Sequence, residues 1–154
     1  MLDMLVNLYD LPDAKEYTDK GIKIKRVLSP DKKKVIDFIR GNFTEGWASE
    51  SEAAFARPLI SCFIAVKNME VVGFACYDAT AKGFFGPTGV KETERGQGIG
   101  EALLLATLNA MKEEGYAYAV IGWCDGARKF YEKAVGAMPI SETGKSVYNR
   151  LINQ

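Results

Sequence analysis

The most constraining feature of this sequence is a run of alternating glycines, Gly96-Gln97-Gly98-Ile99-Gly100, between a strand-like segment and a long helical pattern. The segment 84–90 is apolar but contains a proline and two glycines, which predicts a strand that is bulged or lies at an edge. Helical spacing of apolar residues then runs from about 98 to 114. The first amides of a helix lack internal partners and lie at the positive end of the helix dipole, and glycines leave room for a ligand. The pattern therefore predicts a site for a phosphate or pyrophosphate group.

The rest of the chain predicts one mixed α/β (α+β) domain with a central sheet and flanking helices. A length of 154 residues fits a single domain, so residues 1–154 are interpreted as one unit. Residues 1–21 show little periodicity and are interpreted as an N-terminal extension, in which Val6 and Leu8 could lie on the surface or on a partner. Strands are predicted at 22–27, 60–66, 71–77, 84–90 and 116–123, with two more within 138–151 around a turn at 142–145. Helices are predicted at 31–42, 46–55, 98–114 and 127–134.

The composition excludes several classes of protein. The chain has no histidine, so Ser-His-Asp and Cys-His nucleophile systems and imidazole zinc sites are impossible, and we expect no metal. Twenty basic and twenty acidic residues lack the basic excess of a nucleic-acid binder, so no nucleic-acid partner is expected. No apolar run approaches the roughly 20 residues that span a bilayer, and the start of the chain does not resemble a signal peptide. Three widely spaced cysteines, Cys62, Cys76 and Cys124, indicate reduced thiols and predict a cytoplasmic protein.

The glycine run can be compared with three kinds of nucleotide-binding loop. A Walker loop needs a lysine followed by serine or threonine after its last glycine, and none follows here. The dinucleotide fingerprint Gly-x-Gly-x-x-Gly fails because the third glycine comes one position early. A plain tight turn rarely needs three alternating glycines before so regular a helix. The remaining interpretation rests on a resemblance to a known family.

Arg95 to Gly100 matches the pattern Arg/Gln-x-x-Gly-x-Gly/Ala, and so resembles the acetyl-CoA signature of the GNAT superfamily of N-acetyltransferases. The resemblance covers about residues 22–151 and implies a GNAT fold, with a mixed sheet in which the bulged strand 84–90 splays from its neighbour. It implies acetyl-CoA as the cosubstrate, with the backbone of Val90 against the pantetheine arm and the amides of Gln97 to Glu101 around the pyrophosphate. The implied cofactor-binding residues are Val90, Arg95, Gly96, Gln97, Gly98, Ile99, Gly100 and Glu101.

A second family pattern, Asn-x-x-Ala-x-x-Phe/Leu-Tyr-x-Lys, is matched by Ala127, Phe130, Tyr131 and Lys133. The resemblance gives Tyr131 the role of the general acid that protonates the departing thiolate. The alternative is a core tyrosine whose hydroxyl has a structural partner. The chain departs from the family at Cys124, where asparagine is common, and at 135–137, where Val-Gly-Ala replaces a closing Gly-Phe.

The resemblance implies transfer of an acetyl group from acetyl-CoA to a primary amine of a small-molecule or peptide acceptor. The general base stays open among Glu50, Glu52 and Asp78, and Trp47 is either a wall of the acceptor pocket or plain core. Two other functions stay open: a non-catalytic acyl-CoA-binding or regulatory module, for which Cys124 is the support, and another phosphate- or nucleotide-binding α/β protein. A homodimer formed through edge strands is expected by analogy.

Overall fold

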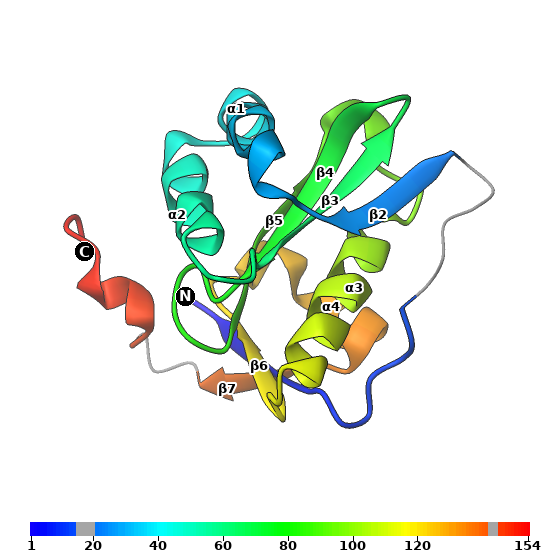
Figure 1. Cartoon of the computed structure of the whole chain (residues 1–154). Coiled ribbons are helices and arrows are strands. Elements are labelled where there is room, and N and C mark those ends of the chain that lie inside the picture. Colours follow the sequence, from blue (N-terminus) through cyan, green and yellow to red (C-terminus); the bar gives the residue numbers. More distant parts are fainter. Residues whose placement is uncertain (15–20, 142–144) are drawn as a thin grey trace.

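The computed structural model describes residues 1–14, 21–141 and 145–154. Within these residues the chain forms one seven-stranded mixed sheet with helices on both faces (Figure 1). The strand order is β2-β3-β4-β5-β6-β1-β7. The strands are β1 (Asp3–Asn7), β2 (Ile22–Arg26), β3 (Cys62–Lys67), β4 (Glu70–Tyr77), β5 (Phe84–Val90), β6 (Tyr118–Ile121) and β7 (Met138–Ser141). The helices are α1 (Lys32–Asn42), α2 (Glu45–Phe55), α3 (Ile99–Glu113) and α4 (Arg128–Val135), with short 3-10 turns η1 (Ser29–Asp31), η2 (Glu92–Glu94), η3 (Asp125–Ala127) and η4 (Val147–Arg150).

The sheet opens between its central strand β5 and the neighbouring β6. Strands β2 to β5 form antiparallel pairs, whereas β5 and β6 run parallel and pair only at Phe84 with Val120 and at Phe85 with Ile121. Two residues after this pairing comes Pro87, which has no N–H to donate to a neighbouring strand. The β4–β5 register also shifts between Ala75 and Tyr77. The bulged, splayed strand predicted from the sequence is thus confirmed.

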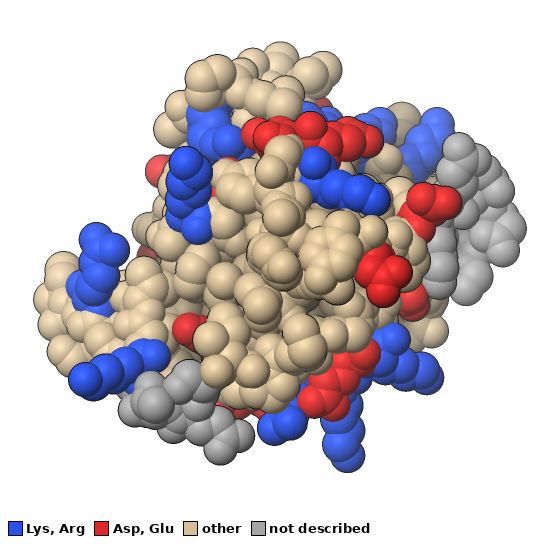
Figure 2. All heavy atoms as spheres, turned by 90° about the horizontal axis from the view of Figure 1, so that it is seen from below, with Lys and Arg blue, Asp and Glu red and all other residues tan. Residues whose placement is uncertain are grey.

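Helices α1 and α2 cover one face of the sheet, and α3 and α4 cover the other (Figure 1). Successive residues of a strand point to opposite faces, so β4 contributes side chains to the hydrophobic cores on both faces of the sheet. Phe74 packs with Ile39 of α1, whereas the next residue, Ala75, belongs to the core that contains Leu103 of α3. On the face shown in Figure 2, acidic and basic side chains are intermingled around an uncharged centre.

The N-terminal residues form a strand that the sequence analysis missed. Strand β1 lies between β6 and β7 and is antiparallel to both. Val6 and Leu8, for which a surface position was considered, are fully buried. The buried residues alternate with more exposed ones, which is the period of a half-buried strand. The buried set is Leu2, Met4, Val6 and Leu8.

The end of the chain differs from the prediction as well. The first of the two strands expected within 138–151 is present as β7, and most of the predicted turn, residues 142–144, lies outside the described residues. The prediction of a second strand is wrong, because the chain forms the 3-10 turn η4 there. The side chain of Ser146 and that of Asn149 each bond the other's backbone in a capping box, which favours this helical turn over an extended segment.

Candidate active site

The glycine run forms the turn from η2 into α3. Gly96 and Gly98 have φ angles of +83° and +82°, a region that residues with a Cβ rarely adopt. Gly98 is the N-cap of α3, and its carbonyl accepts the Ala102 N–H at 3.1 Å. The amides of the first turn of a helix have no acceptor inside the helix and lie at the positive end of its dipole. The loop therefore has the geometry of an anion-binding site.

Side chains hold this loop against the end of β5. The Arg95 Nε donates a hydrogen bond to the carbonyl of Val90 at 3.2 Å. The Gln97 amide donates to the Glu94 carboxylate at 2.8 Å, and the Lys67 ammonium pairs with the same carboxylate at 3.0 Å. The hydrogen bond from Lys67, followed by that from Gln97, lowers the pKa of Glu94.

The end of β5 and the start of α3 also meet α4. A Cβ built on Gly100 would lie 3.8 Å from Cγ2 of Val90 and 4.0 Å from Cζ of Phe130 on α4. The residues predicted from Val90 to Glu101 are therefore brought together beside the helix that carries Tyr131.

A cleft of about 1120 Å³ lies where β5 and β6 separate. Its walls come from β5, the segment after β6, α2, α4 and the C-terminal residues. The lining residues that carry rings, hydroxyl groups or charge are Trp47, Ser49, Glu50, Thr80, Phe85, Thr88, Trp123, Tyr131, Tyr148 and Arg150.

Tyr131 lines this cleft from α4. Its ring packs edge-on against Phe85, with centroids 6.2 Å apart, and against Phe130 at 5.1 Å. No described residue forms a hydrogen bond with its hydroxyl among the contacts of the structure. Burial, and to a lesser extent the neighbouring Cys124, raises the pKa of Tyr131 above its ordinary value. The hydroxyl is therefore protonated at neutral pH and able to donate to a group in the cleft.

The three acids considered as the base lie in different places. Glu50 on α2 lines the cleft and accepts a hydrogen bond from the Thr80 hydroxyl. Burial raises the pKa of Glu50, and the bond from Thr80 acts in the opposite direction. Glu52 is exposed and borders a separate surface hollow beside α1.

The side chain of Asp78 is buried in a structural network and does not line the cleft. It accepts the Tyr116 hydroxyl at 2.6 Å and the Gly83 N–H at 2.6 Å, and it pairs with Arg57 at 3.3 Å. With its oxygens engaged in these contacts, Asp78 ties the end of β4 to the segment that follows α2 and to the segment that precedes β6. Of the three acids, only Glu50 faces the cleft.

The model of the acetyltransferase (GNAT) family matches residues 32–137, which is more than half of the chain. The chain belongs to the GNAT acetyltransferase family. Its fold resembles that of a GCN5-related N-acetyltransferase from Sphaerobacter thermophilus, with a TM-score of 0.70 and 23% identity over 90% of this chain and 47% of that one. It also resembles a GNAT family acetyltransferase from Brucella melitensis in complex with acetyl-CoA, with a TM-score of 0.54 and 20% identity over 72% of this chain and 82% of that one.

A GNAT family N-acetyltransferase from Escherichia coli in complex with CoA has a TM-score of 0.53 and 18% identity, over 66% of this chain and 62% of that one. At such identities these likenesses show the fold. This GNAT chain spans 19% and 47% of the lengths of two structures that match it with a TM-score of 0.70. No curated protein matches its sequence.

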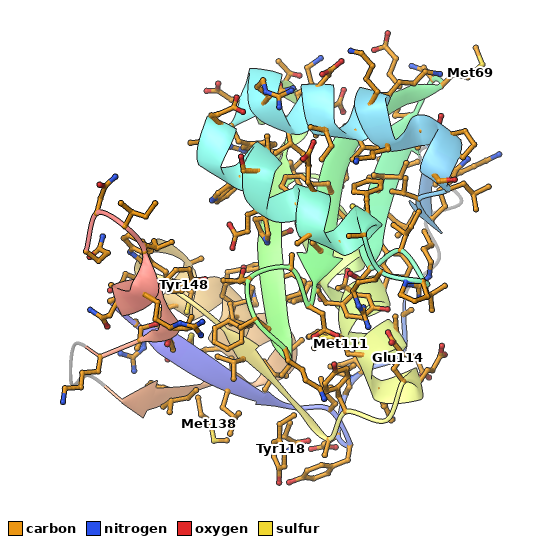
Figure 3. The ribbon with its side chains drawn as sticks, turned by 60° about the vertical axis from the view of Figure 1, so that its left-hand side comes forward. Met69, Met111, Glu114, Tyr118, Met138 and Tyr148 are labelled. Atoms are coloured by element: carbon orange, nitrogen blue, oxygen red, sulfur yellow. The ribbon has the colours of Figure 1, made fainter. Side chains whose placement is uncertain are left out.

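The cleft of this GNAT chain is also lined by a residue that the sequence analysis missed. Tyr148 of η4 lies on the side of the C-terminal segment that faces the sheet (Figure 3) and lines the cleft. Its ring contacts Trp123 edge-on, with centroids 5.3 Å apart. Burial, with the nearby Glu50 charge as a smaller cause, raises the pKa of Tyr148 to about 12. The capping box around Ser146 is the local sequence signal that indicates a helical turn here; nothing local indicates that the turn reaches the cleft.

Asp3 of β1 anchors two walls of the GNAT cleft. Its carboxylate accepts the Trp123 N–H at 3.0 Å through one oxygen and the Ser146 hydroxyl at 2.7 Å through the other. Trp123 has a φ of +49°, which is uncommon for a residue with a Cβ. The bond to Asp3 holds this conformation and places the C-terminal segment beside Trp123.

Cys124, the departure from the family pattern, is buried under the same cleft. Its thiol lies 3.4 Å from the Leu2 carbonyl and 3.6 Å from the Ile121 carbonyl. Burial raises the pKa of Cys124 to about 11, so this thiol is protonated at neutral pH. The described helices of this GNAT chain are all too short or too polar to cross a membrane. Its described residues contain no cluster of three or more acids and cysteines placed to hold a metal ion.

Proposed function

We propose that this chain transfers an acetyl group from acetyl-CoA to a primary amine by direct attack in a ternary complex. The observation that carries the proposal is the joining of two features. The strand that borders the cleft, β5, leads through η2 and the glycine loop into the anion-binding N-terminus of α3. The cleft itself holds a protonated hydroxyl on one wall, from Tyr131, and a carboxylate on another, from Glu50.

The loop residues fit the phosphates of acetyl-CoA. A Cβ built on Gly96 would meet no atom within 4 Å, so the space above this part of the loop is open. The positive φ angles at Gly96 and Gly98 would be strained for any other residue. In this proposal the turn needs these angles in order to present the amides of residues 97–101 to a pyrophosphate. In this proposal Arg95 shapes the loop through its bond to the Val90 carbonyl.

The splay of the sheet supplies polar backbone beside the reacting group. Beyond Phe85, β5 has no pairing with β6, so the backbone groups on that side of residues 86–90 can bind the pantetheine arm and polarise the thioester carbonyl. In this proposal the bulged strand therefore provides unpaired backbone groups for the cosubstrate.

The chemistry follows from the two ionisable groups in the cleft. An amine is mostly protonated at neutral pH and must lose a proton before it can attack, and Glu50 accepts this proton. The nitrogen forms a bond to the acetyl carbon as the carbon–sulfur bond breaks, and the Tyr131 hydroxyl donates its proton to the departing thiolate. The nitrogen releases its remaining excess proton to solvent, Glu50 releases the proton that it accepted, and Tyr131 regains its own from solvent.

The test is the variant Tyr131→Phe, assayed by release of free CoA with a panel of primary amines. Loss of a general acid lowers rates by a factor on the order of 10²–10⁴, so we expect at least about a 100-fold fall in kcat with unchanged acetyl-CoA affinity. The control is Tyr9→Phe, since Tyr9 is an exposed tyrosine away from the cleft. An unchanged kcat in Tyr131→Phe would refute the role of this residue. Tight acetyl-CoA binding without turnover on any amine would instead support a non-catalytic module.

A further inference from the structure

The walls of the acceptor side of the cleft are mainly aromatic and apolar. Trp47 comes from α2, Trp123 from the segment after β6, and Tyr148 from the C-terminal turn. Trp123 is 51% exposed and Trp47 is 36% exposed, although both have aromatic neighbours. Large ring surfaces that converge on one cleft and stay accessible are typical of a site for an apolar ligand.

The charge of the cleft is small and localised. Glu50 and Arg150 are the charged residues among its lining residues in the described part of the chain. Glu50 is partly buried at the side of α2, whereas Arg150 is exposed at the rim. One carboxylate matches one ammonium group, and an additional cationic group on the same acceptor would find no second acid among the described residues that line the cleft and would meet Arg150. A polyamine is therefore a poor match.

Resting on the proposed function, we infer that the acceptor is a monoamine whose single primary amino group is carried on an aromatic or similarly apolar body. The ammonium end lies toward Glu50, and the body lies among Trp47, Trp123 and Tyr148. An amino sugar is a poor match as well, because several hydroxyl groups would be buried against rings that offer few hydrogen-bond partners.

Gly122 lets Tyr148 take its place in this wall. A Cβ on Gly122 would lie 2.6 Å from the Tyr148 hydroxyl oxygen and 2.7 Å from Cε2. Ordinary contacts begin near 3.4 Å, so Gly122→Ala must move the ring by about 0.8 Å, the difference from 2.6 Å. The exchange thus shifts one wall of the acceptor site while adding no polar group.

The experiment compares four acceptors with the 154-residue chain and saturating acetyl-CoA. We expect kcat/KM for phenethylamine and tryptamine to exceed that for spermidine and glucosamine at least tenfold. Tyr148→Ala and Gly122→Ala should reduce this preference severalfold while the acetyl-CoA affinity stays unchanged. In the Tyr148→Ala background, Gly122→Ala should have no further effect. Tyr118→Ala is the matched control, because Tyr118 is an exposed tyrosine at the other end of β6 (Figure 3).

A binding measurement separates this inference from the proposed function. The sequence has two tryptophans, and both line the cleft, so their fluorescence reports binding of an acceptor without any turnover. Saturable quenching by phenethylamine that Tyr148→Ala weakens supports the inference even if no amine is acetylated, and that absence of turnover would overturn the proposed function alone. Equal or better turnover with spermidine or glucosamine would overturn the inference and leave the proposed function standing.

Discussion

Gly89→Ala tests the packing that fixes β5 against the α1–α2 face. A Cβ on Gly89 would lie 2.5 Å from Cζ and 2.6 Å from Cε1 of Phe43. Contacts of ordinary length begin near 3.4 Å, so the Phe43 ring must withdraw by about 0.9 Å, the difference from 2.5 Å. The ring is enclosed by Phe38, Trp47 and Phe74, whose centroids lie 6.0, 5.4 and 5.5 Å away. Overpacking of this kind costs about 1–3 kcal/mol, which urea unfolding should detect as a fall in the unfolding free energy.

A second substitution identifies the cause of that loss. Leucine lacks the Cε and Cζ atoms that clash, so in the Phe43→Leu background Gly89→Ala should cost less than about 0.5 kcal/mol. Gly41→Ala is the control, because Gly41 lies on the exposed side of α1 with no atom within 4 Å of its built Cβ. Alanine is the better helix former, so this control should stabilise the protein by about 0.5–1 kcal/mol. A loss for Gly89→Ala that persists at full size in the Phe43→Leu background would show that the clash with the Phe43 ring is not its cause.

Three further predictions concern the loop, the base and the buried acid network. Gly98→Ala forces a residue with a Cβ to a φ of +82°, so urea unfolding should show a loss of about 1–2 kcal/mol and calorimetry a weaker affinity for acetyl-CoA. Because protonated Glu50 cannot accept a proton, kcat/KM should fall as pH falls through its raised pKa; Thr80→Val removes the bond that lowers this pKa and should move the fall to higher pH in a pH–rate profile. Burial and the bond to Asp78 raise the pKa of Tyr116 to about 12. The protonated Tyr116 hydroxyl therefore contributes fully to the unfolding free energy below its ordinary pKa of 10.0, and this contribution is lost as pH rises through about 12. Tyr116→Phe should lower the unfolding free energy by about 1–3 kcal/mol at pH 7, and urea unfolding of this variant should lack the alkaline decline. The same pH dependence in the variant and the unchanged chain would contradict this assignment.

The strand–loop–helix unit around the glycines was predictable because its signals are local. The interruption at 86–89, the three glycines and the apolar periodicity of 98–114 each act within a few residues. Strand β1 was missed because Met4, Leu5 and Val6 are apolar in succession, and this hides the alternation of Leu2, Met4, Val6 and Leu8.

The composition of the cleft depends on contacts between distant parts of the chain. Glu50 and Glu52 stand two residues apart on α2, and a helix turns them by about 200° relative to each other, so one faces the cleft and the other faces away. No sequence pattern says which one is inside. Tyr148 reaches the cleft because Ser146 bonds Asp3, a residue 143 positions earlier. Such a contact follows from the completed sheet and not from any local signal.

A calorimetric titration tests most directly whether the loop at 95–101 binds acetyl-CoA. Purified protein is titrated with acetyl-CoA, and with ATP and NAD as controls. We expect saturable binding of acetyl-CoA with a Kd in the micromolar range and no binding of either control. A folded sample that fails to bind acetyl-CoA, or that binds ATP or NAD in its place, would contradict this expectation.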